Sequence, residues 1–463
     1  MLRCSILSLF LFAIPASAAE PREETLAGLK RSGEFYRGKV ASHGGYVYYY
    51  SPDLKERWGE GKATADTIFV QPPGTPTVGM AYLKAFEATG DQFYLDAARE
   101  AAEALVYGQL QSGGWTQVIH FGEGKRIGKY RNGKGGGWNV SSLDDGQTQA
   151  ALQFLVRTDG ALGFKHEAIH EAAQYGVKSL LAVQYANGAF PQGWRGPSEK
   201  KPVRAAAFPD YDWKTEGKIK DYYACYTLND NLAGTVAEAL IAAHAVYKDD
   251  ASKAAVAKLG DFLILAQMPA PQPGWCQQYN FDTVPIWARK FEPPAITGWE
   301  SQDVMETLIR IARFTGDPKY LEPIPPALDY FKKNLLKDGR AARYYEFKTD
   351  KPLYMDAKYQ LTYDDGAAPD HYGWKQPARF DAIAKAYEDA KAGRAPAPPA
   401  PVTEKVVRKI LAELDADGRW ISVYAGERLV GQPKFAAGFK FLDSAVFAKN
   451  AEALGEFVRS TKK

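Results

Sequence analysis

Turns that join a glycine to a nearby aromatic residue recur along this chain, each ahead of a polar stretch and a helical one. They lie near residues 45, 114, 188, 274 and 339, at intervals of about 65 to 86 residues. Each interval fits a loop and two helices of ordinary length, so the period indicates a repeated helix pair. One pair cannot bury both of its apolar faces alone, so the pairs must stack. We therefore predict an all-α fold, an α/α toroid of repeated helix hairpins with long aromatic-rich loops. An open α-solenoid and an unrelated multi-helix domain are the alternatives.

The turns just ahead of the predicted helices are rich in Asp and Asn. Asp144-Asp145 precedes a helix over 146–156, and Asn229-Asp230-Asn231 precedes a helix over 232–247. In a ring of hairpins the loops at one end form a groove, so these turns should line that groove. The plainer interpretation is that each Asp or Asn caps the free N–H groups of its helix.

The first nineteen residues have the pattern of a secretory signal. Arg3 supplies the positive charge, Ile6 to Ile14 is a short apolar run, and small residues mark a cleavage site near Ala18/Ala19. The apolar run is too short to cross a bilayer, although a retained membrane anchor is the alternative. We expect a secreted or periplasmic protein.

The rest of the chain divides at a stretch rich in Pro and Ala. We predict the helical ring over 20–390, a stiff linker over 391–401 and a C-terminal helical appendage over 402–463. One helix, Thr403 to Leu414, is expected in the appendage, which should pack back on the ring because it is short for an independent core.

The formal net charge of +3 argues against a nucleic-acid partner, and no second long apolar run points to a membrane. We expect a monomer. Cys225 and Cys276 could pair in an oxidising compartment or stay free. The chain has neither a Gly-x-Ser-x-Gly elbow nor a His-x-Glu-His spacing, so a serine hydrolase and a transition-metal site are not indicated.

The acidic turns suit two kinds of carbohydrate chemistry. Asp144, Asp145 and Asp230 supply the carboxylate oxygens that Ca²⁺ prefers, as a polysaccharide lyase that neutralises a uronate carboxylate would need. A glycoside hydrolase instead needs two carboxylates across the scissile bond, here Asp144 or Asp145 with Asp230. The substrate in the first case is an acidic polysaccharide.

Two loops of similar sequence carry arginines. Tyr279-Asn-Phe-Asp-Thr-Val-Pro precedes Arg289, and the matching stretch Tyr345-Glu-Phe-Lys-Thr-Asp-Lys-Pro follows Arg343. Arginine can bind a carboxylate through two parallel hydrogen bonds. A structural pair between Arg289 and Glu292 is the alternative interpretation.

The segments Gly188–Gln192, Tyr226–Asn231, Trp275–Glu300 and Arg343–Tyr363 together resemble the pectate lyases of polysaccharide lyase family ten. The resemblance covers most of the chain from about 40 to 380. It implies an α/α toroid and a Ca²⁺-assisted β-elimination on polygalacturonate. It also implies that Asp230 and Asn231 lie at the calcium and the substrate and that Arg289 and Arg343 bind substrate carboxylates. We expect the loop aromatics to contact the sugar, namely Trp194, Tyr279 and Trp287.

One loop departs from the family pattern. The resemblance implies an arginine base just after the proline of the last repeat, where this chain has Pro352-Leu-Tyr-Met-Asp-Ala-Lys358. Lys358 is the candidate substitute, since a partly desolvated lysine loses its proton more readily. Otherwise Arg289 or another group is the base, the substrate differs, or the protein binds polysaccharide without cleaving it.

Overall fold

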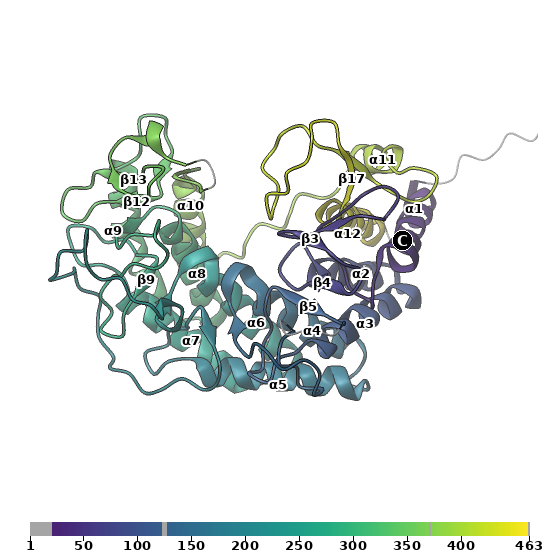
Figure 1. The fold of residues 1–463 in the computed structure, drawn as a ribbon, viewed down its shortest axis with the longest axis horizontal. Coiled ribbons are helices and arrows are strands. Elements are labelled where there is room, and N and C mark those ends of the chain that lie inside the picture. Colours follow the sequence, from purple (N-terminus) through teal and green to yellow (C-terminus); the bar gives the residue numbers. More distant parts are fainter. Residues whose placement is uncertain (1–20, 123–126, 370–371, 462–463) are drawn as a thin grey trace, which may run out of the picture.

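The computed structural model describes residues 21–122, 127–369 and 372–461. The predicted signal peptide, 1–19, lies outside the described residues. The helices form two concentric rows (Figure 1). The inner helices are α2 (Thr75–Thr89), α4 (Gln147–Ala161), α6 (Leu232–Tyr247), α8 (Glu300–Thr315), α10 (Phe380–Lys391) and α12 (Ser444–Ser460). The outer helices are α1 (Pro21–Phe35), α3 (Gln92–Tyr107), α5 (Glu167–Val183), α7 (Asp250–Leu265), α9 (Ile324–Lys333) and α11 (Glu404–Ala412).

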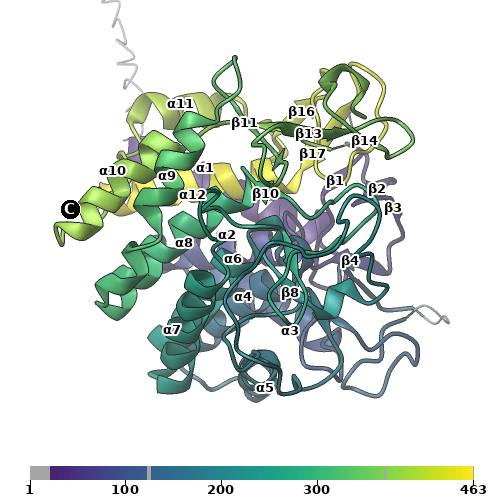
Figure 2. The same cartoon turned by 90° about the vertical axis from the view of Figure 1, so that its left-hand side faces the viewer.

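Each inner helix packs against the next in the order α12, α2, α4, α6, α8 and α10, and each also packs on an outer helix. The predicted α/α toroid of helix hairpins is confirmed. The inner helices follow an arc, and the extended linker from α10 to α11 runs between the two ends of that arc (Figure 1). Figure 2 shows the helices of the later hairpins on one side of the molecule and loops that carry short strands on the other.

Local sequence explains where these helices stop and start. Gly90 and Gly316 end α2 and α8 in the left-handed conformation, with φ of 75° and 77°, which costs glycine nothing. Asp91 then caps α3 by accepting a hydrogen bond from the Phe93 N–H. Asp317 does the same for the turn after α8. The two Thr-Gly-Asp stretches are therefore the same helix-to-helix connection.

A tryptophan hydrogen bond marks three of the hairpins. The indole N–H groups of Trp115 and Trp275 donate to the carbonyls of Leu105 and Leu263, near the ends of α3 and α7, at 2.8 and 2.7 Å. Trp420 makes the same bond at 2.9 Å to a carbonyl of α11. The C-terminal segment therefore repeats the unit, and the described residues form six hairpins.

The C-terminal segment contains more than the one helix predicted from sequence. It holds α11, α12 and the strands β16 (Ile421–Val423) and β17 (Lys440–Asp443). Strand β17 pairs with β1 (Tyr49–Tyr50), and α12 packs against α1 and α2. Gly455 weakens the local helix signal of α12, and it lies against Ala85 and Ala88 of α2, where a Cβ would be in ordinary contact. Contacts with residues far away in the sequence therefore determine that this helix forms.

Short strands join the loops of neighbouring hairpins. The pairs are β4 (Thr67–Phe69) with β5 (Val118–His120), β6 (Ser141–Ser142) with β7 (Gly193–Trp194), and β8 (Tyr226–Thr227) with β9 (Gln278–Tyr279). A four-stranded sheet contains β10 (Ile296–Thr297), β12 (Tyr344–Tyr345), β13 (Pro352–Met355) and β14 (Leu361–Thr362). Two further strands, β2 (Arg57–Trp58) and β3 (Lys62–Ala63), extend the sheet of β1, and β11 (Ala341–Ala342) pairs with β15 (Lys375–Gln376). Each turn ahead of an inner helix is thus tied to its neighbour.

Cys225 and Cys276 are both buried and free, so of the two alternatives the structure shows unpaired thiols. Burial raises the pKa of the Cys225 thiol to about 11. Among the described helices, none combines the length and the apolar character needed to cross a membrane.

Candidate functional site

Two matching turns open the inner helices α4 and α6. In each, a leucine is followed by two acidic or amide residues, and Asp145 and Asp230 adopt left-handed backbone conformations with φ of 45° and 51°. Residues other than glycine rarely adopt this conformation, so surrounding contacts must hold it. The two turns lie side by side, which brings acidic residues far apart in sequence to one place.

Asp144, Asp145 and Asp230 form a compact carboxylate cluster. One oxygen from each lies within 4.8 Å of the others. Partial loss of water around Asp145 raises its pKa to about 6, and the nearby charges of Asp144 and Glu60 add to this effect. Burial, followed by the charges of Asp145 and Asp144, raises the pKa of Asp230 well above its usual range. The cluster therefore holds more negative charge than its surroundings offset.

The donor set of this cluster fits a calcium ion. Ca²⁺ prefers carboxylate and carbonyl oxygens in flexible arrangements, and a cation would relieve the repulsion among the three carboxylates. Sequence analysis named these three residues as metal ligands, and the structure brings all three together.

Arg289 and Arg343 lie at the same end of the ring as the cluster. Both lower the pKa of Asp230 through their charges, and Arg289 also lowers that of Asp145. Arg343 is buried and donates to Glu300 Oε1 at 2.7 Å. Its guanidinium carbon is 4.2 Å from the centre of the Tyr372 ring. Asp230 and the two arginines are therefore close enough for their charges to interact.

The structural pair between Arg289 and Glu292 is also present. The guanidinium donates to both oxygens of the buried Glu292 carboxylate, at 2.9 and 2.6 Å. Burial lowers the pKa of Arg289, but the hydrogen bond and charge of Glu292 outweigh it and raise the pKa overall. In this arrangement Arg289 is suited to bind an anion. To accept a proton it would have to leave Glu292.

Lys358 does not have the surroundings that its expected role requires. It lies in the exposed turn between β13 and β14, where its backbone N–H donates to Asp356 Oδ1 at 2.8 Å. The prediction of Lys358 as base assumed a partly desolvated side chain, so that physical premise is wrong. The neighbouring Tyr359 packs against Lys290 and Phe291 in the loop that carries Arg289, whereas Lys358 itself stays exposed.

The three aromatic residues predicted to contact sugar are buried. The Trp194 indole donates to the Ser112 carbonyl at 2.9 Å and the Trp287 indole to the Trp213 carbonyl at 2.7 Å. The Tyr279 hydroxyl donates to a backbone carbonyl at 2.8 Å. In this structure all three support the loops and cannot reach a polymer. Sequence could not show this, because burial depends on the neighbouring hairpins.

Asn231 follows Asp230 and starts α6 in the left-handed conformation, with φ of 55°. Its side-chain amide occupies the space that a Cβ on Gly234 would fill, so Gly234 is the residue that makes room for it. Asn231 is half-buried and adjoins the cluster, where a substrate contact is feasible.

Sequence analysis missed the glutamines that bind the cluster. Gln192 donates to Asp144 Oδ1 at 2.7 Å, and Gln71 donates to Asp145 Oδ2 at 3.1 Å. Gln71 also donates to Glu60 at 2.9 Å. The signal that could have found Gln192 is its recurring place, two residues after the aromatic residue of a glycine-aromatic turn.

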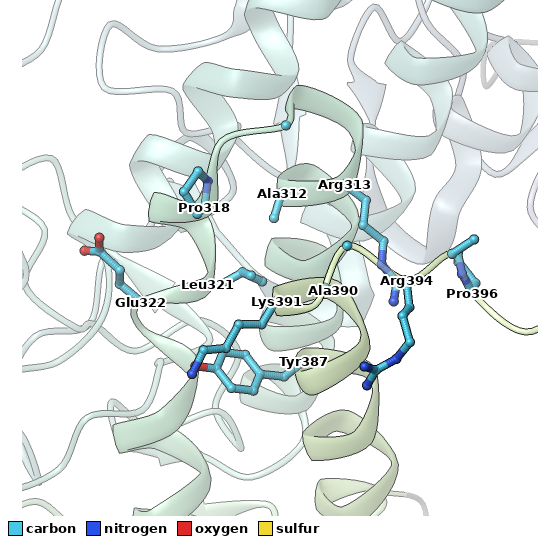
Figure 3. Close-up of a pocket in the computed structure, with 13 residues that line it drawn as sticks. Ala312, Arg313, Pro318, Leu321, Glu322, Tyr387, Ala390, Lys391, Arg394 and Pro396 are labelled. Carbon is cyan, nitrogen blue, oxygen red and sulfur yellow. The ribbon is translucent and has the colours of Figure 1, made fainter.

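Two open pockets border α8 and α10, away from this cluster. One, of about 900 Å³, is lined by the inner helices α4, α6, α8 and α10. The other, of about 710 Å³, is shown in Figure 3 and lies where α8 and α10 end, beside Leu321, Tyr387 and Arg394. Since Glu300 at the opposite end of α8 faces Arg343, the cavity in Figure 3 is not part of the candidate site.

The fold and the site define a helical-toroid protein with an acidic cluster, flanked by arginines, at the starts of its inner helices. Residues 121–342 match the family model described as pectic acid lyase. The resemblance indicated by the motifs is confirmed for this segment. The segment contains Asp144, Asp145, Asp230 and Arg289 and ends just before Arg343.

Solved structures of low sequence identity resemble the chain. A family 10 polysaccharide lyase from Cellvibrio cellulosa is 20% identical, with a TM-score of 0.46 over 63% of this chain and 91% of its own. A mutant of that lyase in complex with trigalacturonic acid is 19% identical, with the same TM-score over 67% and 98%. A GH76 α-mannanase from Bacteroides thetaiotaomicron is 10% identical, with a TM-score of 0.45 over 95% and 98%. No curated protein matches the chain.

Proposed function

We propose that this protein is an exported pectate lyase that cleaves polygalacturonate by calcium-assisted β-elimination. The observation that carries the proposal is the meeting of the carboxylate cluster, Asp144, Asp145 and Asp230, with Arg289 and Arg343 at one end of the ring. A site with both metal-binding acids and carboxylate-binding arginines suits a substrate whose every sugar carries a carboxylate. The family match over 121–342 supports the same substrate class.

β-Elimination breaks the bond between C4 of one uronate and the glycosidic oxygen. A base removes the proton on C5, next to the carboxylate, and the electron pair forms the C4–C5 double bond as the oxygen leaves. The reaction is easier when the carboxylate charge is neutralised, because negative charge moves onto that group. Arg289 and Arg343 would contribute to this, and Ca²⁺ held by the three Asp residues would supply further positive charge.

Arg289 could act as the base only if substrate binding drew its guanidinium away from Glu292, and Arg343 with Ca²⁺ would then neutralise the carboxylate. Lys358 is less suited to this role, because its exposed side chain lacks the desolvation that would favour the neutral amine. A glycoside hydrolase fits less well, because hydrolases place their two carboxylates on opposite sides of the scissile bond. The three carboxylates here crowd within 4.8 Å of one another.

We also propose that residues 1–19 direct export to the periplasm or the medium and that the protein acts as a monomer. Sequencing the N-terminus of protein recovered outside the cytoplasm would test the first point. A start near Ala19 or Glu20 supports it, and an intact Met1 contradicts it. Light scattering of the purified protein would test the second.

The decisive experiment is an absorbance assay on polygalacturonate with and without a calcium chelator. A lyase yields an unsaturated product that absorbs ultraviolet light, and we expect chelation to abolish its formation. Reducing ends without that absorbance would indicate a hydrolase. Binding without either product would indicate a polysaccharide-binding protein, which the absence of an arginine after Pro352 would then explain.

A further inference from the structure

Three glutamines occupy the same place in successive hairpins. Gln117, Gln192 and Gln277 each lie two residues after the aromatic residue of a glycine-aromatic turn. The backbone carbonyl of each accepts a hydrogen bond from the residue just ahead of the polar turn of the preceding inner helix. The bonds run from Val70 to Gln117 at 2.8 Å, from Leu143 to Gln192 at 2.7 Å and from Leu228 to Gln277 at 2.9 Å. This shared backbone bond fixes one register for all three side chains.

The three side-chain amides also have equivalent acceptors. Gln192 donates to Asp144 Oδ1 at 2.7 Å, and Gln277 donates to Asn229 Oδ1. Gln117 donates to Gln71 Oε1 at 3.0 Å. Each acceptor is the first residue of the polar turn, directly after the residue whose N–H bonds the glutamine carbonyl. The turn ahead of each of these inner helices is therefore hydrogen-bonded to the next hairpin through both its backbone and a side chain.

Two of these acceptors, Gln71 and Asn229, donate in turn to the other two carboxylates of the cluster. Gln71 donates to Asp145 Oδ2 at 3.1 Å, and Asn229 donates to Asp230 Oδ2 at 2.5 Å. Each carboxylate of the cluster thus receives one hydrogen bond from a neutral amide. Because a carboxylate offers about four acceptor positions, one such bond orients the group and leaves most of it free. An arginine or lysine in the same place would instead neutralise it.

We propose that Gln192, Gln277 and the pair Gln117–Gln71 are positioning residues that hold the three carboxylates ready for a cation. This inference rests on the proposed function, which makes Ca²⁺ the ligand of the cluster. It adds that the affinity of the site depends on hydrogen bonds from the neighbouring hairpins. In metal sites, loss of such outer partners commonly weakens metal binding by about 10- to 100-fold.

The chain offers a matched control in a second set of glutamines. Gln109, Gln184 and Gln267 lie within two residues of the ends of outer helices and donate only to backbone carbonyls. The Gln184 amide, for example, donates to the carbonyls of Gly188 and Ala255 at 3.0 and 2.9 Å. These bonds hold hairpins together without contacting the cluster. They have the same side chain as the first set of glutamines, but their acceptors are backbone carbonyls and not the residues of the polar turns.

The test measures calcium binding by titration calorimetry and thermal unfolding in chelator for full-length variants. Methionine keeps the length of glutamine and removes its amide. We expect Gln192→Met to bind Ca²⁺ about 10- to 100-fold more weakly and to regain lyase activity at higher calcium. We expect Gln117→Met to have a smaller effect, because it acts through Gln71. Gln184→Met should lower the unfolding temperature and leave calcium affinity unchanged.

The possible results separate this inference from the proposed function. If the wild-type protein binds Ca²⁺ and Gln192→Met binds it equally well, the positioning role is wrong and the lyase proposal stands. If Gln184→Met weakens binding as much as Gln192→Met, the effect is a general loss of stability and the inference also fails. If the wild-type protein binds no Ca²⁺, the positioning role is overturned, and ultraviolet-absorbing product formed in chelator would still identify a lyase.

Discussion

The carboxylate of Glu292 holds the guanidinium of Arg289 by two hydrogen bonds and accepts a third, at 2.9 Å, from the Arg289 backbone N–H. Glu292 itself is almost completely buried, while the arginine side chain is 37% exposed. The pair therefore presents one face of a fixed cation toward the end of the ring where the carboxylates gather. A substrate carboxylate would meet a group whose orientation is already set.

Replacing Arg289 with alanine should remove that contact. Hydrogen bonds to charged groups contribute about 1.5–3 kcal/mol, so we expect kcat/KM on polygalacturonate to fall by at least about 10- to 100-fold. The helical circular dichroism spectrum should not change. Arg408→Ala, which removes an exposed arginine paired with Glu404 on α11, is the control. Unchanged activity in Arg289→Ala would exclude this residue from the site.

The buried pair of Arg343 and Glu300 should matter for stability as well as for binding. Arg343→Ala leaves the Glu300 carboxylate without its partner, and breaking a buried pair in this way costs about 3–5 kcal/mol of unfolding free energy. The double variant with Glu300→Gln should recover part of that loss. Urea unfolding of the three proteins measures both values, and equal stability of single and double variants would contradict the pairing.

The pH dependence of stability should reflect Asp145. Loss of water raises its pKa to about 6, so the folded state binds this proton more tightly than the unfolded state does. Without calcium, stability should therefore fall as pH rises from about 4 to about 6, and this contribution should be constant above that range. Calcium affinity should rise over the same range, because the metal needs the ionised carboxylate.

Asp145→Asn should make this fall in stability shallower. Asp303 and Asp443 also have pKa values raised to about 6 by burial, and they remain in the variant. The difference between the two proteins thus reports Asp145 together with Asp230, whose pKa the charge of Asp145 raises. Thermal unfolding at intervals of pH in chelator gives the curves, and parallel curves would show that Asp145 is not the group responsible.

The sixth hairpin should be needed for stability. Trp420 is buried and its indole donates to the Ile410 carbonyl, so Trp420→Ala removes both a large core side chain and a hydrogen bond. Such a change typically costs about 3–5 kcal/mol. Calorimetry should show a lower unfolding temperature, whereas calcium affinity should be retained because the cluster is remote in the ring. An unchanged unfolding temperature would indicate that the last hairpin packs only loosely.

The parts of the structure that sequence could predict are those set by local chemistry. The recurring glycine-aromatic turns predicted the hairpins and their order, because turns depend on a few adjacent residues. The acidic turns gave the carboxylate cluster, because the same local pattern places Asp145 and Asp230 at the starts of neighbouring helices.

The parts that sequence could not predict depend on contacts between hairpins. From the sequence alone, Trp194 and Tyr279 resemble exposed aromatic residues that stack on sugars. In the structure the pairing of the adjacent strands buries them. The role of Gln192 depends on its hydrogen bond to Asp144, which only the structure shows. Helix α12 was missed because its partner is α2, more than three hundred residues earlier in the chain.

The pairing of β17 with β1 and of α12 with α2 has a consequence for biosynthesis. The first hairpin emerges early, but the surface that covers it is made more than three hundred residues later. An apolar side of α2 therefore stays exposed to water until α12 has been synthesised. The first and sixth hairpins can close the ring only after that point.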